Sequence, residues 1–229
     1  MYNMSRIKLL HFSILVVLFL SFLQGCANAQ KQHVPASQQR FEDIEYWVRV
    51  FDDPKRDEWQ KPEEVIKAMR LKQGDVVADL GAGTGYFTRR FAVAVSPEGN
   101  ALGLEVEPNM VKYMKQDAEK LKLKNYISKL VKYDDPLLEP GSVDVVFICD
   151  TYHHLEDRVA YLKKMSKGLK DRGRVVVVDF HKKDLPVGPP DLEHKLAEET
   201  VIKEFREAGY RLIKKHDILP YQYFLEFGL

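Results

Sequence analysis

Residues 76–86 constrain the fold of this chain more than any other segment, because three glycines alternate with other residues directly after an apolar run. The segment reads Val-Val-Ala-Asp-Leu-Gly-Ala-Gly-Thr-Gly-Tyr. The apolar run is typical of a buried strand, and Gly81, Gly83 and Gly85 allow a sharp turn and a close approach of a ligand to the backbone. A helix start after them would offer free N–H groups to a negative group. We therefore expect a strand, a loop that binds a nucleotide-type ligand, and a helix.

The spacing of these glycines differs from two common phosphate-binding loops. The dinucleotide fingerprint needs a small residue where this chain has Tyr86, and no Gly-Lys-Ser/Thr follows to make a Walker loop. The spacing therefore disfavours a nicotinamide-dependent oxidoreductase, which we keep as an alternative, and argues against Walker-type phosphate binding.

Strand-like and helix-like patterns alternate along the chain. We expect strands at residues 76–80, 101–106, 126–130, 143–149, 174–180, 210–217 and 222–227, and helices at 41–51, 62–71, 86–95, 108–121, 157–169 and 191–208. Apolar runs such as the four valines at 175–178 suit strands buried on both faces. The alternation predicts an α/β fold with a doubly wound, mostly parallel, seven-stranded sheet. Only four residues join the last two strands, so these should form a C-terminal antiparallel hairpin.

Residues 1–29 have the layout of a secretory signal, with Arg6 and Lys8 before an apolar stretch at 9–23 and small residues after it. The uninterrupted apolar core is shorter than the ~18–20 residues that span a bilayer. Leu-Gln-Gly-Cys, ending at Cys26, resembles a bacterial lipobox, whereas Ala-Asn-Ala before Gln30 fits ordinary cleavage. We expect an exported lipoprotein held at the membrane on the periplasmic side through Cys26. Simple secretion into the periplasm and an uncleaved anchor are the alternatives.

Charge and cysteine content narrow the classes of partner. The chain has 35 Lys and Arg residues against 34 Asp and Glu residues, so nothing supports a nucleic-acid partner, which would need a basic face. Its two cysteines, Cys26 and Cys149, cannot build a disulfide framework. We expect no metal site, because His153 and His154 are adjacent rather than four residues apart.

Acidic residues lie near the ends of two of the expected strands. Glu105 lies about 20 residues beyond the last glycine, where a carboxylate that binds ribose hydroxyls belongs. Asp79, one strand earlier, is placed either to fix the glycine loop or to meet an ammonium group on the ligand.

In their order, these motifs resemble those of the class I S-adenosylmethionine-dependent methyltransferase family, in its small-molecule branch. Residues 79–85 are similar to the first motif of the family, Gly-Leu-Glu at 103–105 with Pro-Asn-Met at 108–110 to the second, 144–150 to the fourth strand, and 169–174 to the turn into the fifth. The resemblance covers about residues 59–229, with glutamate at 105 in place of the commoner aspartate and Lys-Asp at 170–171 in place of Lys-Pro. It divides the chain into a leader at 1–29, a tether with an amphipathic helix at 30–57, and a methyltransferase domain at 58–229.

The resemblance implies S-adenosyl-L-methionine as the cofactor and assigns a set of residues to it. These are Asp79, Gly81, Ala82, Gly83, Gly85, Glu105, Val106, Asp134 and Asp135. The first loop residues would pass under the methionine part, Glu105 would bind ribose, Val106 would pack on adenine, and Asp134 or Asp135 would meet the adenine amino group. An ordinary Asp-Asp-Pro turn explains the last two residues equally well.

The segment Asp-Thr-Tyr-His-His at 150–154 follows the fourth strand, at the edge where such sheets bind ligands. Methyl transfer from a sulfonium is an in-line displacement, for which the protein mainly holds the nucleophile near attack distance. We expect His153 to act as a base where the acceptor must lose a proton, Asp150 to lie near the sulfonium, and Tyr152 to line the acceptor pocket. Capping or packing by the histidines is the alternative.

The segment before the first core strand has two interpretations. The helix at 41–51 and the run at 56–62 form either a lid over the site or a packing helix, and Trp59 is placed to stack on a substrate. The function that we expect is methyl transfer to a small, apolar or membrane-associated acceptor. The alternative is a catalytically inactive exported lipoprotein that binds a metabolite or partner, because the cofactor is made in the cytosol and the leader predicts export.

Overall fold

The computed structural model describes residues 43–229. The leader predicted at 1–29 and the lipid attachment at Cys26 lie outside the described residues. Among the residues that are described, no helix is both long and apolar enough to span a membrane.

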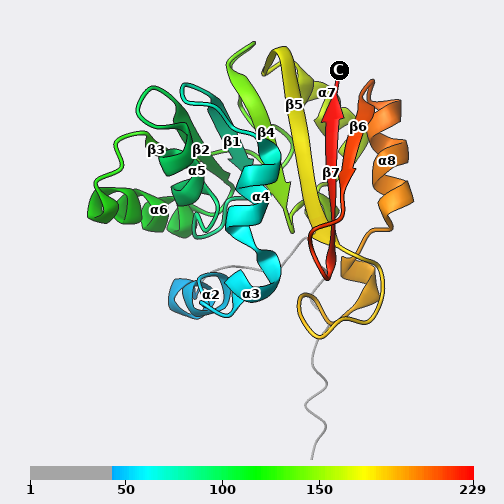
Figure 1. Ribbon diagram of the computed structural model, residues 1–229, viewed down its shortest axis with the longest axis horizontal. Helices are drawn as coiled ribbons and strands as arrows, with labels where there is room; N and C mark the ends of the chain where they lie inside the picture. The colour runs from blue at the N-terminus through cyan, green and yellow to red at the C-terminus, as the bar shows by residue number, and fades with distance from the viewer. Residues whose placement is uncertain (1–42) are drawn as a thin grey trace, which may run out of the picture. The chain divides into compact units, whose positions relative to one another are not determined.

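Seven strands form a single sheet in the order β3-β2-β1-β4-β5-β7-β6 (Figure 1). The strands are β1 (Val76–Leu80), β2 (Asn100–Glu105), β3 (Tyr126–Leu130), β4 (Val143–Cys149), β5 (Leu169–Phe180), β6 (Arg211–His216) and β7 (Gln222–Gly228). The first five pair in parallel, whereas β7 pairs antiparallel with both β5 and β6. The predicted doubly wound sheet and its C-terminal antiparallel hairpin are therefore confirmed.

Helices cover both faces of the sheet. The helices α4 (Pro62–Met69), α5 (Thr88–Val95) and α6 (Pro108–Leu121) pack on one face, and α7 (Arg158–Ser166) and α8 (Glu198–Glu207) pack on the other. In Figure 1, α4 lies in front of the sheet and α7 behind it. Successive valines of β5 alternate between the two cores, because side chains along a strand point to opposite faces. Burial on both faces explains why the four consecutive residues at 175–178 are all apolar.

Two short helices precede α4 in the chain. They are α2 (Ile44–Phe51), capped by the Asp43 side chain, and α3 (Arg56–Gln60), which the sequence did not predict. Both lie at the edge where the parallel strands end (Figure 1). At this edge β1 lies between β2 and β4. The helix that follows β2 is α6 and the helix that follows β4 is α7, and these two helices pack on opposite faces of the sheet. Such a reversal leaves a crevice at the carboxyl ends of the strands.

The structure corrects two element boundaries. One helix was predicted at 191–208, but the structure has two separate elements there. The first is a single 3₁₀ turn, η3 (Leu192–His194), and the second is α8, which begins only at Glu198. Lys195 between them is extended and buried, and its ammonium group donates to the carbonyl of Lys183. Residues 169–174, predicted as a turn, belong to β5, where the pairing with β4 shifts register.

Candidate functional site

The glycine loop after β1 has the backbone geometry that its sequence predicted. Gly81, Gly83 and Gly85 have φ values of +71°, +55° and +78°, a region that favours glycine. A Cβ atom on Gly81 would overlap the side chain of Thr151, which follows β4. The Thr151 hydroxyl donates to the carbonyl of Cys149 at 2.9 Å. The loop therefore lies directly against the end of β4.

Backbone hydrogen bonds tie the same loop to the end of β2. The amides of Gly81 and Ala82 both donate to the carbonyl of Leu104, at 2.9 and 3.2 Å. The amide of Gly83 donates to Oε2 of Glu105 at 2.8 Å. The loop thus bridges the carboxyl ends of β2 and β4.

Glu105 accepts three backbone hydrogen bonds. In addition to the bond from Gly83, its Oε1 accepts from the amides of Val106 and Glu107, at 2.7 and 3.2 Å. Burial raises the pKa of this carboxyl, although the three N–H groups favour its charged form. A carboxylate offers about four acceptor positions, so one remains, on Oε2. This arrangement can take one ribose hydroxyl, where the sequence had suggested two.

Asp79 stabilises the start of α5 and does not bind the amides of the loop. Its Oδ2 accepts from the hydroxyl of Thr88 at 2.6 Å. The side chain is buried, and burial raises the pKa of its carboxyl to about 7. Its predicted role as partner of a ligand ammonium group stays a prediction.

The two acids predicted to meet adenine lie in a turn. Asp134 is exposed and pairs with Lys164 at 3.0 Å, and Oδ1 of Asp135 accepts from the amide of Leu137 at 2.9 Å. These contacts match the Asp-Asp-Pro turn that was the alternative interpretation. Val106 is half-buried and packs against the core next to α7 and α8, and its contact with adenine stays a prediction.

Asp150 follows β4 in a left-handed conformation, with φ of +51°. Its Oδ1 accepts from Nε2 of Gln222 at 2.6 Å, and its Oδ2 lies 3.7 Å from the guanidinium of Arg56. Burial and the neighbouring carboxylate of Asp179 raise the pKa of Asp150. A left-handed backbone is uncommon for a residue other than glycine, and such strain gathers at functional sites.

His153 forms a pair with a carboxylate that the sequence analysis missed. Its Nδ1 lies 3.0 and 3.2 Å from the two oxygens of Asp179, a fully buried residue near the end of β5. Burial opposes the charged imidazolium, but Asp179 and Asp150 outweigh it and raise the pKa of His153. Burial and the neighbouring His153 lower the pKa of His154 to about 4. The available signal was the single acid in the apolar run of β5.

Tyr152 lies in the core and not beside Asp150. It has no exposed surface, and its hydroxyl donates to Glu204 of α8 at 2.8 Å. The residues from Tyr152 to His154 form one 3₁₀ turn, η2, which points successive side chains about 120° apart. The turn therefore brings His153 to Asp179 and sends Tyr152 into the layer of α8, away from the place where an acceptor pocket was expected.

The N-terminal segment lies over the glycine loop. Asp52, at the end of α2, accepts from the hydroxyl of Thr84 at 2.8 Å and from Arg89 and Tyr113 at 3.2 Å each. The ring of Phe51 lies 3.4 Å from the place that a Cβ atom on Gly83 would occupy. These contacts fit a lid and a packing helix equally well.

The short helix α3 brings two further residues to the site. The guanidinium of Arg56 lies 4.1 Å from the centre of the Tyr86 ring and donates to the carbonyl of Phe51 at 3.1 Å. It also donates to Gln60, which is fully buried. Trp59 packs against Phe180, with 5.6 Å between ring centres, and its predicted stacking on a substrate stays a prediction.

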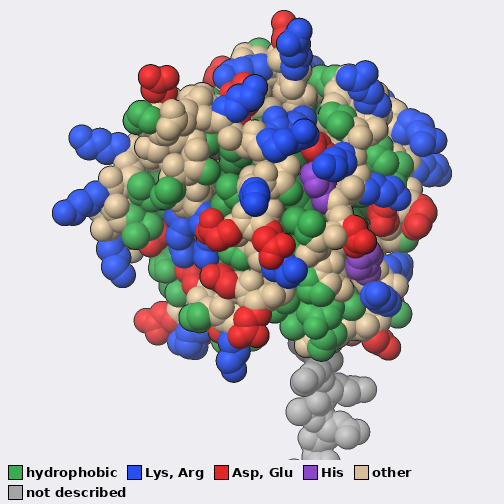
Figure 2. All heavy atoms as spheres, viewed as in Figure 1, with side chains coloured by type: hydrophobic (Ala, Val, Ile, Leu, Met, Phe, Trp, Pro, Cys, Tyr) green, Lys and Arg blue, Asp and Glu red, His purple; other side chains and the backbone are tan. Residues whose placement is uncertain are grey.

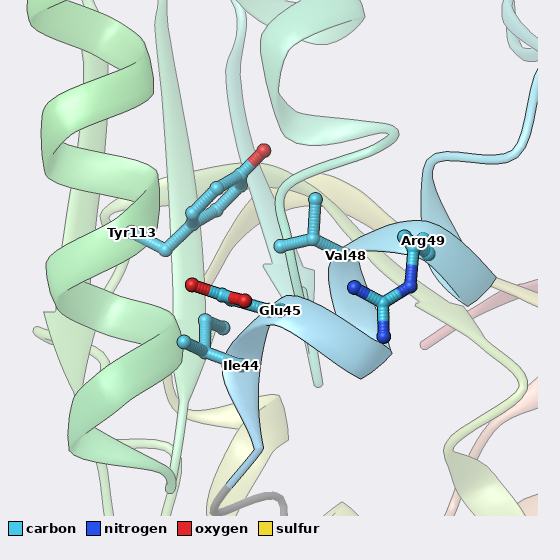
Figure 3. Close-up of a pocket in the computed structure, with 5 residues that line it drawn as sticks. All are labelled: Ile44, Glu45, Val48, Arg49 and Tyr113. Carbon is cyan, nitrogen blue, oxygen red and sulfur yellow. The ribbon is translucent and has the colours of Figure 1, made fainter.

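A separate hollow of about 280 Å³ lies between α2 and α6. Figure 3 shows Tyr113 of α6 facing Ile44 and Val48 of α2 across it. The hollow contains none of the predicted catalytic residues. Over residues 43–229, no group of three or more His, Cys, Asp or Glu side chains is placed to hold a metal ion.

Comparison with known proteins gives consistent matches. A family model described as a methyltransferase domain matches residues 71–223. The demethylmenaquinone methyltransferase of Staphylococcus carnosus (strain TM300) is 32% identical over 131 residues, which are 56% of this chain and 52% of that protein. That of Staphylococcus aureus (strain JH9) is 30% identical over 132 residues, with the same shares. The chain thus spans about half the length of the curated relatives that it matches.

Solved structures match over more of the chain. An S-adenosylmethionine-dependent methyltransferase from Aquifex aeolicus superposes with a TM-score of 0.74 at 27% identity, covering 81% of this chain and 97% of that one. A putative type 11 methyltransferase from Sulfolobus solfataricus has a TM-score of 0.55 at 20% identity, with coverage of 80% and 89%. At that identity the second match supports the fold alone.

Proposed function

The chain belongs to the methyltransferase domain family, and on that premise we propose that it transfers a methyl group from S-adenosyl-L-methionine to a small acceptor. The observation that carries the proposal is the convergence of the glycine loop, Glu105 and Asp150 at the carboxyl ends of three adjacent strands. This crevice is where open α/β sheets bind their ligands.

The residues at this edge fit such a cofactor. The bare backbone at Gly81 and Gly83 permits close approach, and Glu105 has one acceptor position left for a ribose hydroxyl. Asp79 lies near the end of β1 and Asp150 directly follows β4, and their carboxylates suit a cationic ligand. When bound, S-adenosyl-L-methionine would supply a methyl group on a positively charged sulfur, and this sulfur would keep the electron pair of the S–CH3 bond as a neutral thioether.

His153 is the residue that we propose to remove a proton from the acceptor. Asp179 contacts Nδ1 and so fixes the ring, which leaves Nε2 as the nitrogen that takes the proton. Both Asp179 and Asp150 favour the imidazolium that results. The chain's contribution to the displacement itself is to hold the acceptor in line with the methyl group and to exclude water.

We propose an apolar acceptor. Two relatives are named as demethylmenaquinone methyltransferases, and an apolar ring acceptor of that kind suits a protein held at a membrane. The charge of the chain is balanced, and Figure 2 shows basic and acidic side chains interspersed over the face viewed. A balanced charge gives a polyanion no net attraction to the chain.

Titration calorimetry on the full chain tests this function. We expect S-adenosylmethionine and S-adenosylhomocysteine each to bind at one site, and Gly83→Arg to abolish binding because its side chain would occupy the loop. Gly141→Arg is the matched control, because a side chain at this glycine, also at positive φ, meets nothing within 4 Å. A folded wild-type chain that binds neither ligand would refute the proposal, and binding without turnover of apolar quinone acceptors would favour the inactive alternative.

We further propose that Cys26 carries lipid and holds the chain at a membrane. Acyl chains contribute ~0.8 kcal/mol per buried methylene, enough for a stable anchor when two or more are attached. Labelled fatty acid should be incorporated into the wild type and into Cys149→Ala, and not into Cys26→Ser. Label retained by Cys26→Ser, or an unlabelled protein in the soluble periplasm, would contradict this proposal.

A further inference from the structure

Arg56 and Asp150 form an incomplete ion pair at the mouth of the proposed cofactor site. Their nearest nitrogen and oxygen are 3.7 Å apart, which is too long for a hydrogen bond. Their side chains are only 13% and 23% exposed. Arg56 uses four of its five N–H donors, two on Gln60 and one each on the Phe51 carbonyl and the Cys149 sulfur. Oδ2 of Asp150 accepts from the Cys149 thiol at 3.6 Å. Each charged group therefore keeps bonding capacity for a further partner.

Two buried amides hold the charged groups in place. Oε1 of Gln60 accepts from Nε and from a terminal nitrogen of Arg56, each at 3.2 Å, and Nε2 of Gln60 donates to Oε1 of Gln222 at 2.6 Å. Gln222 in turn donates to Asp150 at 2.6 Å. The four side chains form a ring that joins α3, β7 and the end of β4. Amides orient the two charges without neutralising them, so both are organised before a ligand arrives.

We propose that this pair clamps the amino-acid end of the cofactor, with its carboxylate on Arg56 and its ammonium group on Asp150. The inference rests on the proposed function and names the residues that would recognise one part of that ligand. An amino acid carries the opposite charges of this pair, side by side, so it can pair with both groups at once.

Charge balance also favours a carboxylate on Arg56. A guanidinium in the same site as a sulfonium would repel it, because like charges in a partly buried site interact strongly. A ligand that brings its own carboxylate to Arg56 removes this repulsion, whereas a ligand with the same nucleoside and no amino-acid end does not. The clamp therefore makes the site selective for the whole cofactor over its nucleoside fragment.

The test compares two ligands by titration calorimetry on the full chain. S-adenosylhomocysteine carries the amino-acid end, and 5′-methylthioadenosine has the same nucleoside and a thioether without that end. In Arg56→Met, we expect the affinity for S-adenosylhomocysteine to fall about ten- to hundredfold, which is typical of the loss of hydrogen bonds to a charged group. The affinity for 5′-methylthioadenosine should change less than about threefold. Arg56→Lys should recover part of the loss, because it restores the charge.

Arg90→Met is the matched control. The guanidinium of Arg90 lies 4.2 Å from the centre of the Tyr86 ring that Arg56 also contacts, but it pairs with Asp57 and Glu63. This variant should bind both ligands as the wild type does. If a folded Arg56→Met chain lost the same factor in affinity for both ligands, the clamp would be overturned. The ring of four side chains around Arg56 would then have a structural role. A wild type that binds neither ligand would instead refute the proposed function.

Discussion

At the scale of single residues, Gly81 is constrained in two separable ways. Its φ of +71° is unfavourable for any residue with a Cβ atom, and that atom would overlap Thr151. Gly141 has a similar φ of +60° but has nothing within 4 Å of the added atom. The two glycines therefore separate the cost of the backbone conformation from the cost of the overlap.

We predict that Gly81→Ala destabilises the chain more than Gly141→Ala. The left-handed backbone alone costs an alanine ~1–2 kcal/mol, which is the expected effect at 141. At 81 the overlap adds ~1–3 kcal/mol, because the loop must move away from the end of β4. Urea unfolding of both variants measures the difference, and equal losses would mean that the loop yields without cost.

The carboxyl of Asp79 makes stability depend on pH. Its pKa rises from 3.8 to about 7 in the folded state because of burial, so the folded chain holds this proton more tightly than the unfolded chain does. The resulting stability is fully present below pH ~4 and is lost as the pH rises through ~7. We predict that raising the pH from 4 to 8 lowers the free energy of unfolding less in Asp79→Asn than in the wild type. The difference between the two decreases should reach up to ~4 kcal/mol.

Urea unfolding across this pH range checks the prediction about Asp79. Asp53→Asn serves as the control, because Asp53 is exposed and its side chain accepts from the amide of Lys55. The control should follow the wild type across the range. Parallel stability curves for Asp79→Asn and the wild type would contradict the prediction.

At the scale of elements, Asp52 fastens α2 to the glycine loop. The helix has no fully buried residue, so it depends on contacts at its end. In Asp52→Ala the bonds from Thr84, Arg89 and Tyr113 are lost. We predict that the amides of α2 exchange with solvent roughly ten- to hundredfold faster in this variant, because exchange reports local opening. Asp53→Ala should leave α2 unchanged, and unaltered protection of α2 in Asp52→Ala would contradict the prediction.

The strands were predictable because their signal is local. The consecutive valines of β5 make both faces of that strand apolar. The glycines after β1 indicate the loop by themselves, whatever the rest of the chain does. The break before α8 was not predictable, because it depends on the burial of Lys195 against the carbonyl of Lys183. Helical periodicity cannot show such a contact.

The site was predictable only in part. The sequence placed the glycine loop and Glu105 together, and the bond from Gly83 to Glu105 shows that they lie side by side. It misplaced Tyr152, because the direction of a side chain in a one-turn helix is set by the packing of α8. It missed Asp179 and Arg56, because their partners are remote in sequence and become neighbours only through the sheet.

At the scale of the whole molecule, a ligand in the crevice would contact the ends of three adjacent strands, β2, β1 and β4, and the N-terminal helix α3. We predict that S-adenosylhomocysteine at one hundred times its Kd stabilises the folded chain by ~2.7 kcal/mol. For a chain of this size that is a rise in Tm of roughly 5–10 °C. Scanning calorimetry measures it, and NADH serves as the comparison. A rise with NADH and none with S-adenosylhomocysteine would support the nicotinamide alternative.

The bond between Gln60 and Gln222 also governs when the site can exist. It joins residues 162 positions apart, one in α3 and one in β7, the last strand in chain order. A ribosome makes α3 early and β7 late, so the ring around Arg56 closes only after nearly all of the described chain has emerged. A chain threaded through a membrane before folding would therefore arrive without bound cofactor. Its supply would have to be on the side where β7 finally pairs.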